Sequence, residues 1–513
     1  MTLAVVLCAA HGVCAQTTDS EHIAGARRTL ALFEQELTVI EQLLDASARF
    51  QAANYVFRHV NVVDVAAGVI RPDMRVRVAG GRIVDVAPDR GTPVPRGFRE
   101  IDGHGKYLMH GLVDMHVHQL TSASQHLLHV ASGVTTVRDM VGFPWLLEWR
   151  DLSRRDAWLA PSMYVAGPIL STVRMGMYAH VISNGQDARE AVREHDRLGY
   201  DFIKVHNVLP KPLFRAVTDE ARRLGIPVVG HVPHRVTVAE AVGAGLLTLE
   251  HLKGYIDDRT LQIAADDWIS PTRDSHVWNT PTLYTHRLFL TPPAAREWAS
   301  TDEARFVPRL VRERWLGEVG APPTIAVELL GKQREVMRRL LPVSTRFLAG
   351  TDAGGGYPFM VSGFALYEEL RLLHDAGLPL LETIRAATWY PARALGAESE
   401  FGRVAVGLRA DLLLLDSNPL VSLAALRSAA GVMLRGRWLT RAAIDHELKL
   451  LAITYAEIPD IAFAASLPDV AWIAEVDRRT LLARERGYVF PQHHLEDIER
   501  AFRALGLRTS LHR

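Results

Sequence analysis

Between residues 110 and 395, segments with the pattern of buried strands alternate with segments that have the period of amphipathic helices. The helical period is clear over residues 187–198 and 212–224. The strand-like segments end near His118, Arg138, Ala166, His206, His231, Glu250, Thr282 and Asp352. Eight strands that alternate with helices predict an α/β fold, a (β/α)8 TIM barrel. Residues 256–341 exceed what one strand–helix unit needs, and we expect a helical insert there that walls a substrate cleft.

The segments on either side of this region have different patterns. Residues 55–109 and 402–440 contain short runs rich in Val and Leu, separated by glycine turns as in hairpins. We expect these two segments to combine into one small composite β-sandwich domain. Residues 20–52 predict an N-terminal helix packed on the body, with an exposed partner helix as the alternative. Residues 441–513 predict a helical C-terminal tail.

The charge balance and the hydropathy exclude two kinds of partner. Lys and Arg number 58 and so do Asp and Glu, which gives a formal net charge of zero. This balance argues against nucleic-acid binding through bulk positive charge. No apolar run reaches the roughly 18 to 20 residues of a membrane span.

The N-terminal segment has the composition of a signal peptide. Residues 1–15 are mostly small and apolar, and Val13-Cys14-Ala15 resembles a signal-peptidase site. We therefore expect a secreted or periplasmic protein, although no Lys or Arg precedes Arg27 and the usual positive region is missing. The alternative is a frayed apolar N-terminus. Both cysteines lie in this segment, so after cleavage a metal site would use His, carboxylates or Lys.

Six residues that can bind a metal stand at or near the ends of predicted strands. His116 and His118 are two apart on a strand, so both imidazoles face one side and can hold a divalent cation. Later strands end with Lys204, His231, His251 and Asp352. Because the carboxyl ends of barrel strands converge at one mouth, we expect all six side chains to meet there.

Each of these residues also has a purely structural explanation. Lys204 could be a buried lysine paired with Asp139 or Asp352, and Asp352 could cap a helix after the glycines that follow it. His231 and His251 could be ordinary core histidines. If there were no metal site, all of these structural explanations would have to be true together, which is improbable. The six-residue set therefore favours a metal site.

The set closely resembles the amidohydrolase superfamily, in its binuclear subtype with a carboxylated lysine. The likeness is greatest to the branch that contains imidazolonepropionase-like hydrolases and metal-dependent dipeptidases, and it covers roughly residues 55–440. The motifs that carry it are Gly111-Leu112-Val113-Asp114-Met115-His116-Val117-His118, Phe202-Ile203-Lys204-Val205, Gly230-His231-Val232, Glu250-His251-Leu252 and Gly350-Thr351-Asp352. One departure is His110, where the family usually has proline; we expect a backbone effect there and no loss of metal.

The resemblance implies a role for each member of the set. His116, His118 and Asp352 would bind the more buried metal ion, His231 and His251 the second, and Lys204 would carry a carbamate that bridges both. Two divalent ions are expected, zinc by default, with manganese, cobalt and iron left open. The ions would bridge a hydroxide, and Asp352 would shuttle its proton to the leaving amine.

Two further residues are candidates for substrate binding. By resemblance to dipeptidases, Tyr255 could hydrogen-bond a substrate carboxylate or carbonyl; the alternative is a packed aromatic. His180 follows the third predicted strand and could bind a substrate carboxylate or the developing oxyanion.

The predicted function is hydrolysis of the C–N amide bond of a small substrate, either a dipeptide or an N-acyl amino acid. Alternatives are a cyclic amide, lactone or carbamate on the same metals, or a catalytically silent metal-binding homologue. The intact Asp352 argues against the silent homologue, which has no need of a proton shuttle. The expected partner is a small molecule, with a homo-oligomer left open.

Overall fold

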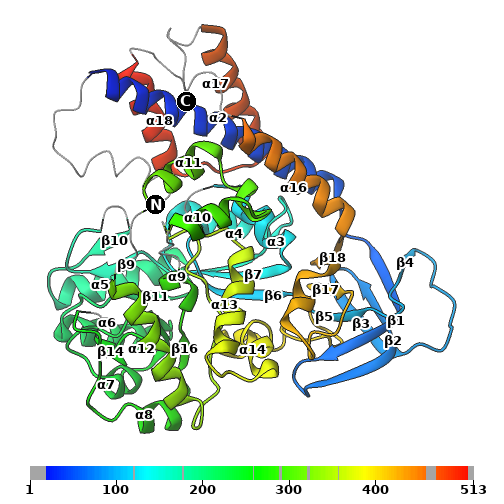
Figure 1. The fold of residues 1–513 in the computed structure, drawn as a ribbon, viewed down its shortest axis with the longest axis horizontal. Coiled ribbons are helices and arrows are strands. Elements are labelled where there is room, and N and C mark those ends of the chain that lie inside the picture. The colour runs from blue at the N-terminus through cyan, green and yellow to red at the C-terminus, as the bar shows by residue number, and fades with distance from the viewer. Residues whose placement is uncertain are drawn as a thin grey trace.

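Strands and helices alternate along the central part of the chain, as an α/β fold requires (Figure 1). The computed structural model describes residues 19–119, 122–175, 178–257, 259–287, 292–319, 324–355, 357–457 and 470–505. The predicted signal peptide, residues 1–15, lies outside the described residues. So do residues 458–469 and 506–513 of the predicted C-terminal tail.

The two hairpin-rich segments form one sheet. The N-terminal segment contributes β1 (Asn54–Asp64), β2 (Val69–Ala79), β3 (Arg82–Pro88), β4 (Phe98–Asp102) and β5 (Tyr107–His110). The later segment contributes β17 (Leu412–Leu415), β18 (Ala429–Leu434) and β19 (Arg437–Thr440). The order is β19-β18-β17-β5-β1-β2-β3, with β4 paired to β1, so the strands make one eight-stranded sheet instead of two separate sheets.

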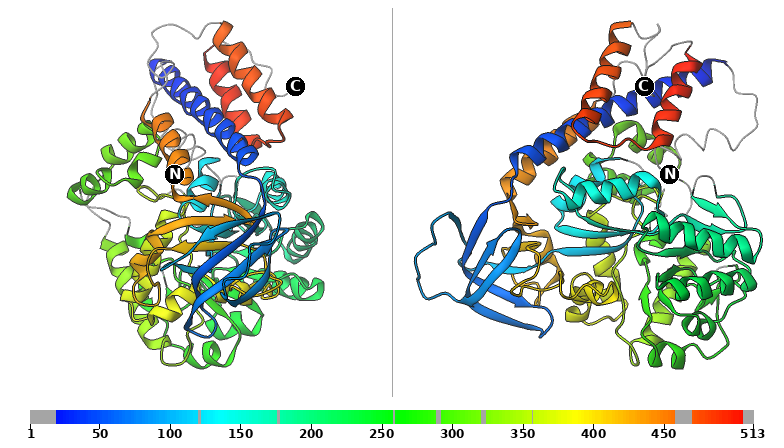
Figure 2. Two further views of the ribbon diagram at one scale, coloured as in Figure 1. Left: turned by 90° about the vertical axis from the view of Figure 1, so that its right-hand side faces the viewer. Right: turned by 180° about the vertical axis from the view of Figure 1, so that it is seen from behind.

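Antiparallel pairing of β17 with β5 joins the two halves of this sheet, with Leu412 opposite His110. Alternate residues such as Phe57, Val76 and Leu414 point to one side and form a hydrophobic cluster separate from that of the barrel region. In Figure 2 the early and late strands of this sheet lie side by side. Strand β5 ends two residues before the start of β6, which carries His116, the first predicted metal ligand.

The central strands are parallel and fall into two sheets. The first contains β6 (Leu112–Val117), β7 (Val134–Asp139) and β8 (Ser162–Val165). The second has the order β10-β9-β11-β12-β13-β16. Its strands are β9 (Ile169–Ser171), β10 (Ala179–Val181), β11 (Ile203–Val205), β12 (Val228–Gly230), β13 (Leu246–Glu250) and β16 (Trp278–Thr280).

Single parallel bridges join these sheets to each other and to the segment that precedes Asp352. The bridges are Ala166 to Phe202, Asn279 to Phe347, and Val117 to Ala353. The prediction of an α/β fold is therefore confirmed. In the described residues the pairing is two parallel sheets linked by single bridges, without one continuously paired barrel.

Helices follow most of the central strands. The predicted helices over 187–198 and 212–224 are α5 (Gly185–Leu198) and α6 (Lys211–Leu224). The Asn184 side chain caps α5 by accepting from two backbone N–H groups, and Gly199 ends it with a φ of +83°. The others are α3 (Ser124–Ala131), α4 (Pro144–Arg154), α7 (Val238–Gly243), α13 (Phe364–Asp375), α14 (Leu380–Ala386), α15 (Trp389–Ala394) and the 3-10 helix η3 (Leu423–Arg427).

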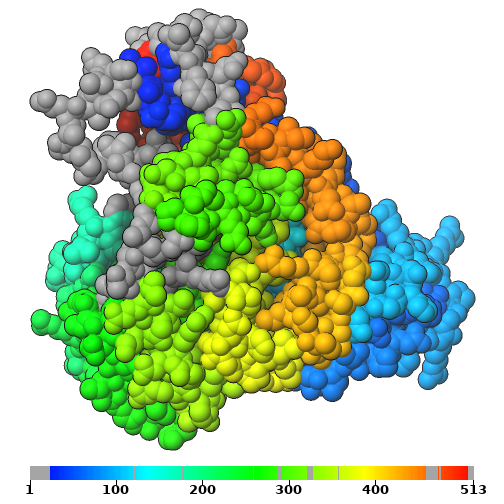
Figure 3. Space-filling model, in the orientation of Figure 1, coloured from blue at the N-terminus to red at the C-terminus, as the bar shows by residue number. Residues whose placement is uncertain are grey.

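The segment predicted as an insert is mostly helical. It contains β14 (Ile256–Asp257), β15 (Gln262–Ile263), α8 (Ile269–Asp274), α9 (Leu283–Arg287), α10 (Pro292–Ala299), η2 (Glu303–Phe306), α11 (Arg309–Gly317) and α12 (Thr324–Leu340). In the space-filling view, residues 292–317 form a block beside α16 (Arg441–Ala456) (Figure 3).

Helices from both ends of the chain pack together on one side of the body. The long helix α2 (Asp19–Arg49) lies against α16, α17 (Val470–Glu485) and α18 (Gln492–Ala504) (Figures 1 and 2). Ion pairs such as Arg479 to Glu41, at 2.9 Å, tie the tail to α2. Among the helices that the structure describes, none is long and apolar enough to cross a membrane.

Candidate metal centre

A chain of histidine rings runs across the carboxyl ends of the parallel strands. His116 lies in β6 and His118 just beyond it, while His231 and His251 directly follow β12 and β13. The ring centroids of His118 and His116 are 5.3 Å apart, those of His116 and His251 4.7 Å, and those of His251 and His231 4.8 Å. His206 continues the chain, 4.3 Å from His231. The four histidines of the predicted set therefore lie side by side in one row.

Asp352 joins this row through the bridge between its segment and β6. Its Oδ1 lies 2.7 Å from His118 Nε2 and 3.3 Å from His116 Nε2. Its backbone N–H donates to the His116 carbonyl at 2.7 Å, and its φ of +63° is unusual for a non-glycine residue. The ligand atoms of these three residues all lie within 4.8 Å of one another, close enough for one ion.

Glu250 fixes which nitrogen of His116 can bind a metal. Burial opposes ionisation of Glu250, but the Arg138 charge and the hydrogen bond with His116 hold the pKa of this carboxyl below its usual range. The carboxylate accepts from His116 Nδ1 at 2.7 Å, and burial lowers the pKa of His116 to about 4, so the ring is neutral at pH 7. A neutral ring that donates from Nδ1 keeps a lone pair on Nε2.

The His116 Nε2 lone pair thus faces the Asp352 carboxylate, which is also an acceptor. Burial alone would raise the pKa of Asp352, but the surrounding imidazoles, among them His118 through its hydrogen bond, hold it well below its usual range. His116 Nε2 and Asp352 Oδ1 are thus two buried acceptors 3.3 Å apart, with no proton to form a hydrogen bond between them. A divalent cation satisfies both, so the residues present fit a metal ion.

The second pair of histidines offers a similar arrangement. His251 Nδ1 lies 2.6 Å from Thr282 Oγ1. That hydroxyl donates to the Pro281 carbonyl, so it accepts from His251 and leaves the His251 Nε2 lone pair free. Among the described residues, Nδ1 of His231 and Nδ1 of His118 have no hydrogen-bond partner. A buried nitrogen without a partner is available to a ligand.

Lys204 lies within β11 and is 2% exposed. Burial lowers the pKa of its amine to about 8, while the charges of Glu250 and Asp352 act in the opposite direction. No ion pair joins it to Asp139 or Asp352 in the part of the chain that the structure describes. Asp139 instead accepts backbone N–H groups of Gln119 and Val141, at 2.6 and 2.9 Å.

Two glycines in the motifs are required by close packing of the strands. A Cβ on Gly350 would lie 2.5 Å from Thr280 Cγ2 and 2.8 Å from His116 Cβ. At Gly230, where φ is +133°, a Cβ would overlap the Val205 carbonyl oxygen. These glycines let the strands that carry His116, His231 and Asp352 approach one another.

The two predicted substrate-binding residues, Tyr255 and His180, contact residues outside the histidine row. Tyr255 is fully buried, its hydroxyl is 3.0 Å from Thr272 Oγ1, and its ring packs edge-on against Trp268 at 5.3 Å. This is the packed-aromatic arrangement, in which the hydroxyl already has a partner. His180 lies in β10, and its Nδ1 is 3.2 Å from Nε2 of His195 on α5.

Sequence reasoning missed two residues that act on the centre. Arg138, which the sequence placed only at a strand end, is fully buried, pairs with Glu250 at 2.8 Å and donates to the Met115 carbonyl at 2.7 Å. Opposite charges on two buried parallel strands were the available signal. Tyr357 hydrogen-bonds Asp352, whose charge, with burial, raises the pKa of the Tyr357 phenol above its usual value. No spacing rule points to this loop residue.

Removing Arg138 should destabilise the protein because it leaves Glu250 as an uncompensated buried charge. We expect Arg138→Met to lower the free energy of unfolding of metal-free protein by about 3 to 5 kcal/mol. Urea denaturation followed by circular dichroism measures this. The double variant Arg138→Met/Glu250→Gln should recover part of the loss. A loss below about 1 kcal/mol, typical of an exposed pair, would contradict the buried pairing.

Parallel strands followed by helices, with histidines and a carboxylate at the strand ends, define an α/β protein whose candidate site could hold a metal ion. The particular family is established by sequence. The profile of the amidohydrolase family matches residues 107–439, which is more than half of the chain, and the protein belongs to this family.

Curated relatives are adenine deaminases. Adenine deaminase 3 of Rhizobium meliloti is 32% identical over 101 residues, which cover 20% of this chain and 15% of that protein. An adenine deaminase of Chelativorans sp. is 24% identical over 396 residues, covering 74% of this chain and 57% of that enzyme. The matched part thus spans less than two thirds of the length of these relatives.

Solved structures with the same fold include amide hydrolases. The bottromycin amidohydrolase is 25% identical, with a TM-score of 0.67, and the match covers 82% of this chain and 94% of that one. A protein from Bifidobacterium longum assigned as a prolidase is 27% identical, with a TM-score of 0.61, over 78% of this chain and 99% of that one.

Proposed function

We propose that the protein is a binuclear metal-dependent amidohydrolase that hydrolyses the C–N amide bond of a dipeptide or an N-acyl amino acid. The observation that carries this proposal is the convergence of His116, His118 and Asp352, with His251 and His231 beside them. Family membership supports hydrolysis at a C–N bond. The names of the prolidase-like and bottromycin amidohydrolase neighbours favour an amide substrate.

The proposed ligands divide between two ions. His116, His118 and Asp352 would hold the first, because their ligand atoms lie within 4.8 Å of one another. His231 and His251 would hold the second. Zinc is the metal that suits imidazole and carboxylate ligands best among common choices. When bound, the two ions lower the pKa of a water molecule toward about 7 and polarise the scissile carbonyl.

Lys204 is proposed to bridge the two ions as a carbamate. Its neutral amine would attack the carbon of carbon dioxide, forming an N–C bond while one C=O electron pair moves to oxygen. The nitrogen then loses a proton to solvent, which leaves an anionic carbamate with two oxygen ligands. Its burial, together with the absence of an ion pair to Asp139 or Asp352 in the described residues, leaves the amine available for this step.

Protein side chains would then transfer the proton and keep the Asp352 carboxylate and the His116 ring in position. The Asp352 carboxylate would accept the proton of the attacking water and donate it to the leaving amine. The Tyr357 hydroxyl, bonded to Asp352, would orient the carboxylate. Glu250 would keep His116 in the tautomer that presents Nε2 to the metal.

Two other substrate classes remain candidates on the same site. The adenine deaminase relatives favour hydrolytic removal of an amino group from a purine. A cyclic amide, lactone or carbamate would use the same carbonyl chemistry. A panel of dipeptides, N-acyl amino acids, adenine, hydantoins, lactones and carbamates, run with zinc-loaded protein and bicarbonate, separates these classes. Turnover of none of them would favour a silent metal-binding homologue.

We also propose that the two central sheets and the segment before Asp352 make up a (β/α)8 barrel, which the three parallel bridges between them support. The eight-stranded sheet, with its own hydrophobic cluster, is proposed as a composite β domain. Secretion or export to the periplasm stays a proposal from residues 1–15.

Metal analysis should find about two divalent ions per chain, as the six-ligand set requires. Dialysis against a strong chelator should abolish hydrolysis, and zinc with bicarbonate should restore it. Inductively coupled plasma mass spectrometry of reconstituted protein checks the count. Fewer than one ion per chain after careful reconstitution would rule out a binuclear centre.

A further inference from the structure

A cavity of about 470 Å³ opens between the insert helices and α13. One hydrogen bond and one loop connect its wall to the segment of Asp352. The Thr285 hydroxyl of α9 donates to the carbonyl of Thr351, the neighbour of Asp352, at 3.1 Å. Tyr284 of the same helix lines the cavity, as does Phe359 from the loop that follows Asp352. The volume suits a small-molecule side chain.

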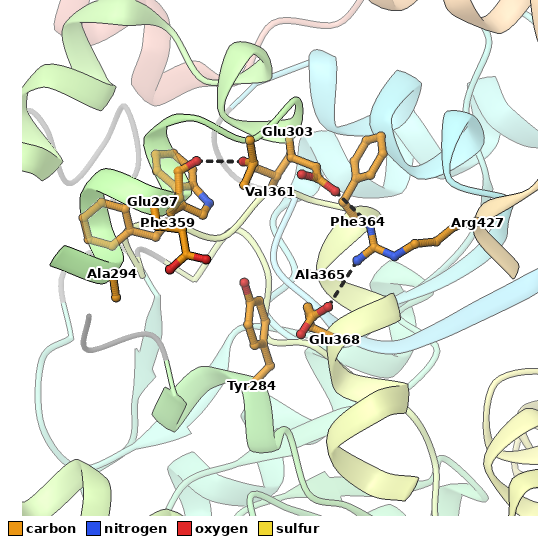
Figure 4. A pocket seen from close by; sticks show the side chains of 12 residues that line it. Tyr284, Ala294, Glu297, Glu303, Phe359, Val361, Phe364, Ala365, Glu368 and Arg427 are labelled. Carbon is orange, nitrogen blue, oxygen red and sulfur yellow. Dashed lines mark hydrogen bonds and ion pairs between the residues drawn. The ribbon is translucent and has the colours of Figure 1, made fainter. Parts of the chain in front are cut away.

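The walls of this cavity are aromatic. Trp298 of α10 packs edge-on against Phe359, with ring centroids 5.0 Å apart. Tyr284 approaches from the opposite side in Figure 4. Faces of aromatic rings carry negative charge density and attract cations, Trp most strongly.

The charged groups of the cavity are predominantly acidic. Three carboxylates, those of Glu297, Glu303 and Glu368, line it against one guanidinium, that of Arg427. Arg427 lies 2.9 Å from Glu303 and 3.2 Å from Glu368 (Figure 4). Its guanidinium also stacks over the Tyr367 ring at 4.7 Å. Its charge is therefore already compensated and is not free for an anionic ligand.

Glu297 differs from the other two carboxylates of the cavity in its pairing. Within the described residues it forms no ion pair, whereas Glu303 and Glu368 both pair with Arg427. It is adjacent in sequence to Trp298, so a carboxylate and an indole ring line the same cavity. A carboxylate beside aromatic rings is the chemistry that recognises an ammonium or guanidinium group.

We propose that this cavity binds the positively charged end of a substrate side chain, so that the preferred amides contain a basic residue of the lysine or arginine type. This inference rests on the proposed amide hydrolysis. Tyr284, Trp298 and Phe359 provide the apolar and aromatic walls, and Glu297 neutralises the cation. Helix α9 and the loop after Asp352 connect this subsite to the segment that carries Asp352.

The experiment compares ligands that differ only in the terminal ammonium. Calorimetric titration of zinc-loaded protein with L-lysine and L-norleucine measures binding without turnover. Hydrolysis of lysyl-glycine and glycyl-lysine is compared with that of the two norleucine analogues. We expect lysine to bind about 10-fold more tightly than norleucine, with a similar ratio in kcat/KM. Glu297→Gln and Trp298→Leu should each reduce this preference several-fold.

Glu328→Gln, which removes an exposed carboxylate of α12 outside the cavity, is the matched control and should leave the preference unchanged. Lysine preference that depends on Glu297, without hydrolysis of any amide, would keep the subsite and reject the proposed function. Hydrolysis without lysine preference, or with a preference that Glu297→Gln leaves intact, would overturn the subsite alone. Preference for an acidic side chain would assign the cavity to Arg427 and would also overturn it.

Discussion

Asp352→Asn is expected to retain most of the bound metal while turnover falls by about 10²- to 10⁴-fold, the range for loss of a general acid–base group. Asparagine keeps the shape of the side chain and one oxygen ligand, but it cannot accept a proton. Asp352 Oδ1 lies 2.7 Å from His118 Nε2, so the side chain is held at the centre of the ligand group. Metal content and kcat should be measured on the same preparations.

His116→Ala is the matched comparison, because it removes a ligand without touching the proposed proton acceptor. We expect this variant to lose metal first and activity as a consequence. Loss of the imidazole also leaves the Glu250 oxygen that accepted from Nδ1 without that partner. An Asp352→Asn enzyme with two metals and near-normal turnover would move the proton shuttle elsewhere, and His206, in ring contact with His231, would be the next residue to change.

The proximity of the candidate ligands could be predicted because their positions follow from topology. Parallel strands bring their carboxyl ends to one edge, so residues separated by more than 200 positions, such as His116 and Asp352, meet without any local sequence signal. The alternation of strand and helix also predicted α5 and α6 to within a few residues. Period and strand order were therefore sufficient for the α/β fold and for the meeting of the histidines.

Loop geometry could not be predicted in the same way. Tyr255 follows His251 by only four positions, yet its ring packs into the core and its hydroxyl bonds Thr272 of α8. The segment around Asp352 was expected to form a full strand, but it forms only single bridges, at Phe347 and Ala353. Such details depend on side-chain packing between segments distant in sequence, which periodicity does not encode.

The supporting network behind His116 shows a further limit. Arg138 and Glu250 were visible as charged residues at strand ends, but strand alternation alone did not decide which side each faces. In the fold they pair at 2.8 Å, and Glu250 orients His116 from behind. Each buried charge is acceptable only with its partner present, so neither role follows from one residue considered alone.

Lys204→Ala is expected to lose metal and activity together, unlike Asp352→Asn. Lys204 is 2% exposed, and the charges of Glu250 and Asp352 act on the pKa of its amine, so it lies close to the candidate metal centre. If its carbamate bridges both ions, the loss of metal affinity should exceed the roughly 10- to 100-fold that removal of a supporting partner costs. Competition with a zinc-binding dye measures the affinity.

Lys211→Ala is the control, because it deletes an equivalent side chain that pairs with Glu240 on the outer helices and has no contact with the histidine row in the described residues. It should bind two ions normally. A short carboxylic acid added with zinc should partly restore metal binding and turnover to Lys204→Ala, since its carboxylate supplies two oxygens in place of the carbamate. A Lys204→Ala protein that binds two ions with unchanged affinity would exclude the carbamate bridge, and so would electron density for an unmodified lysine that points away from fully occupied metals.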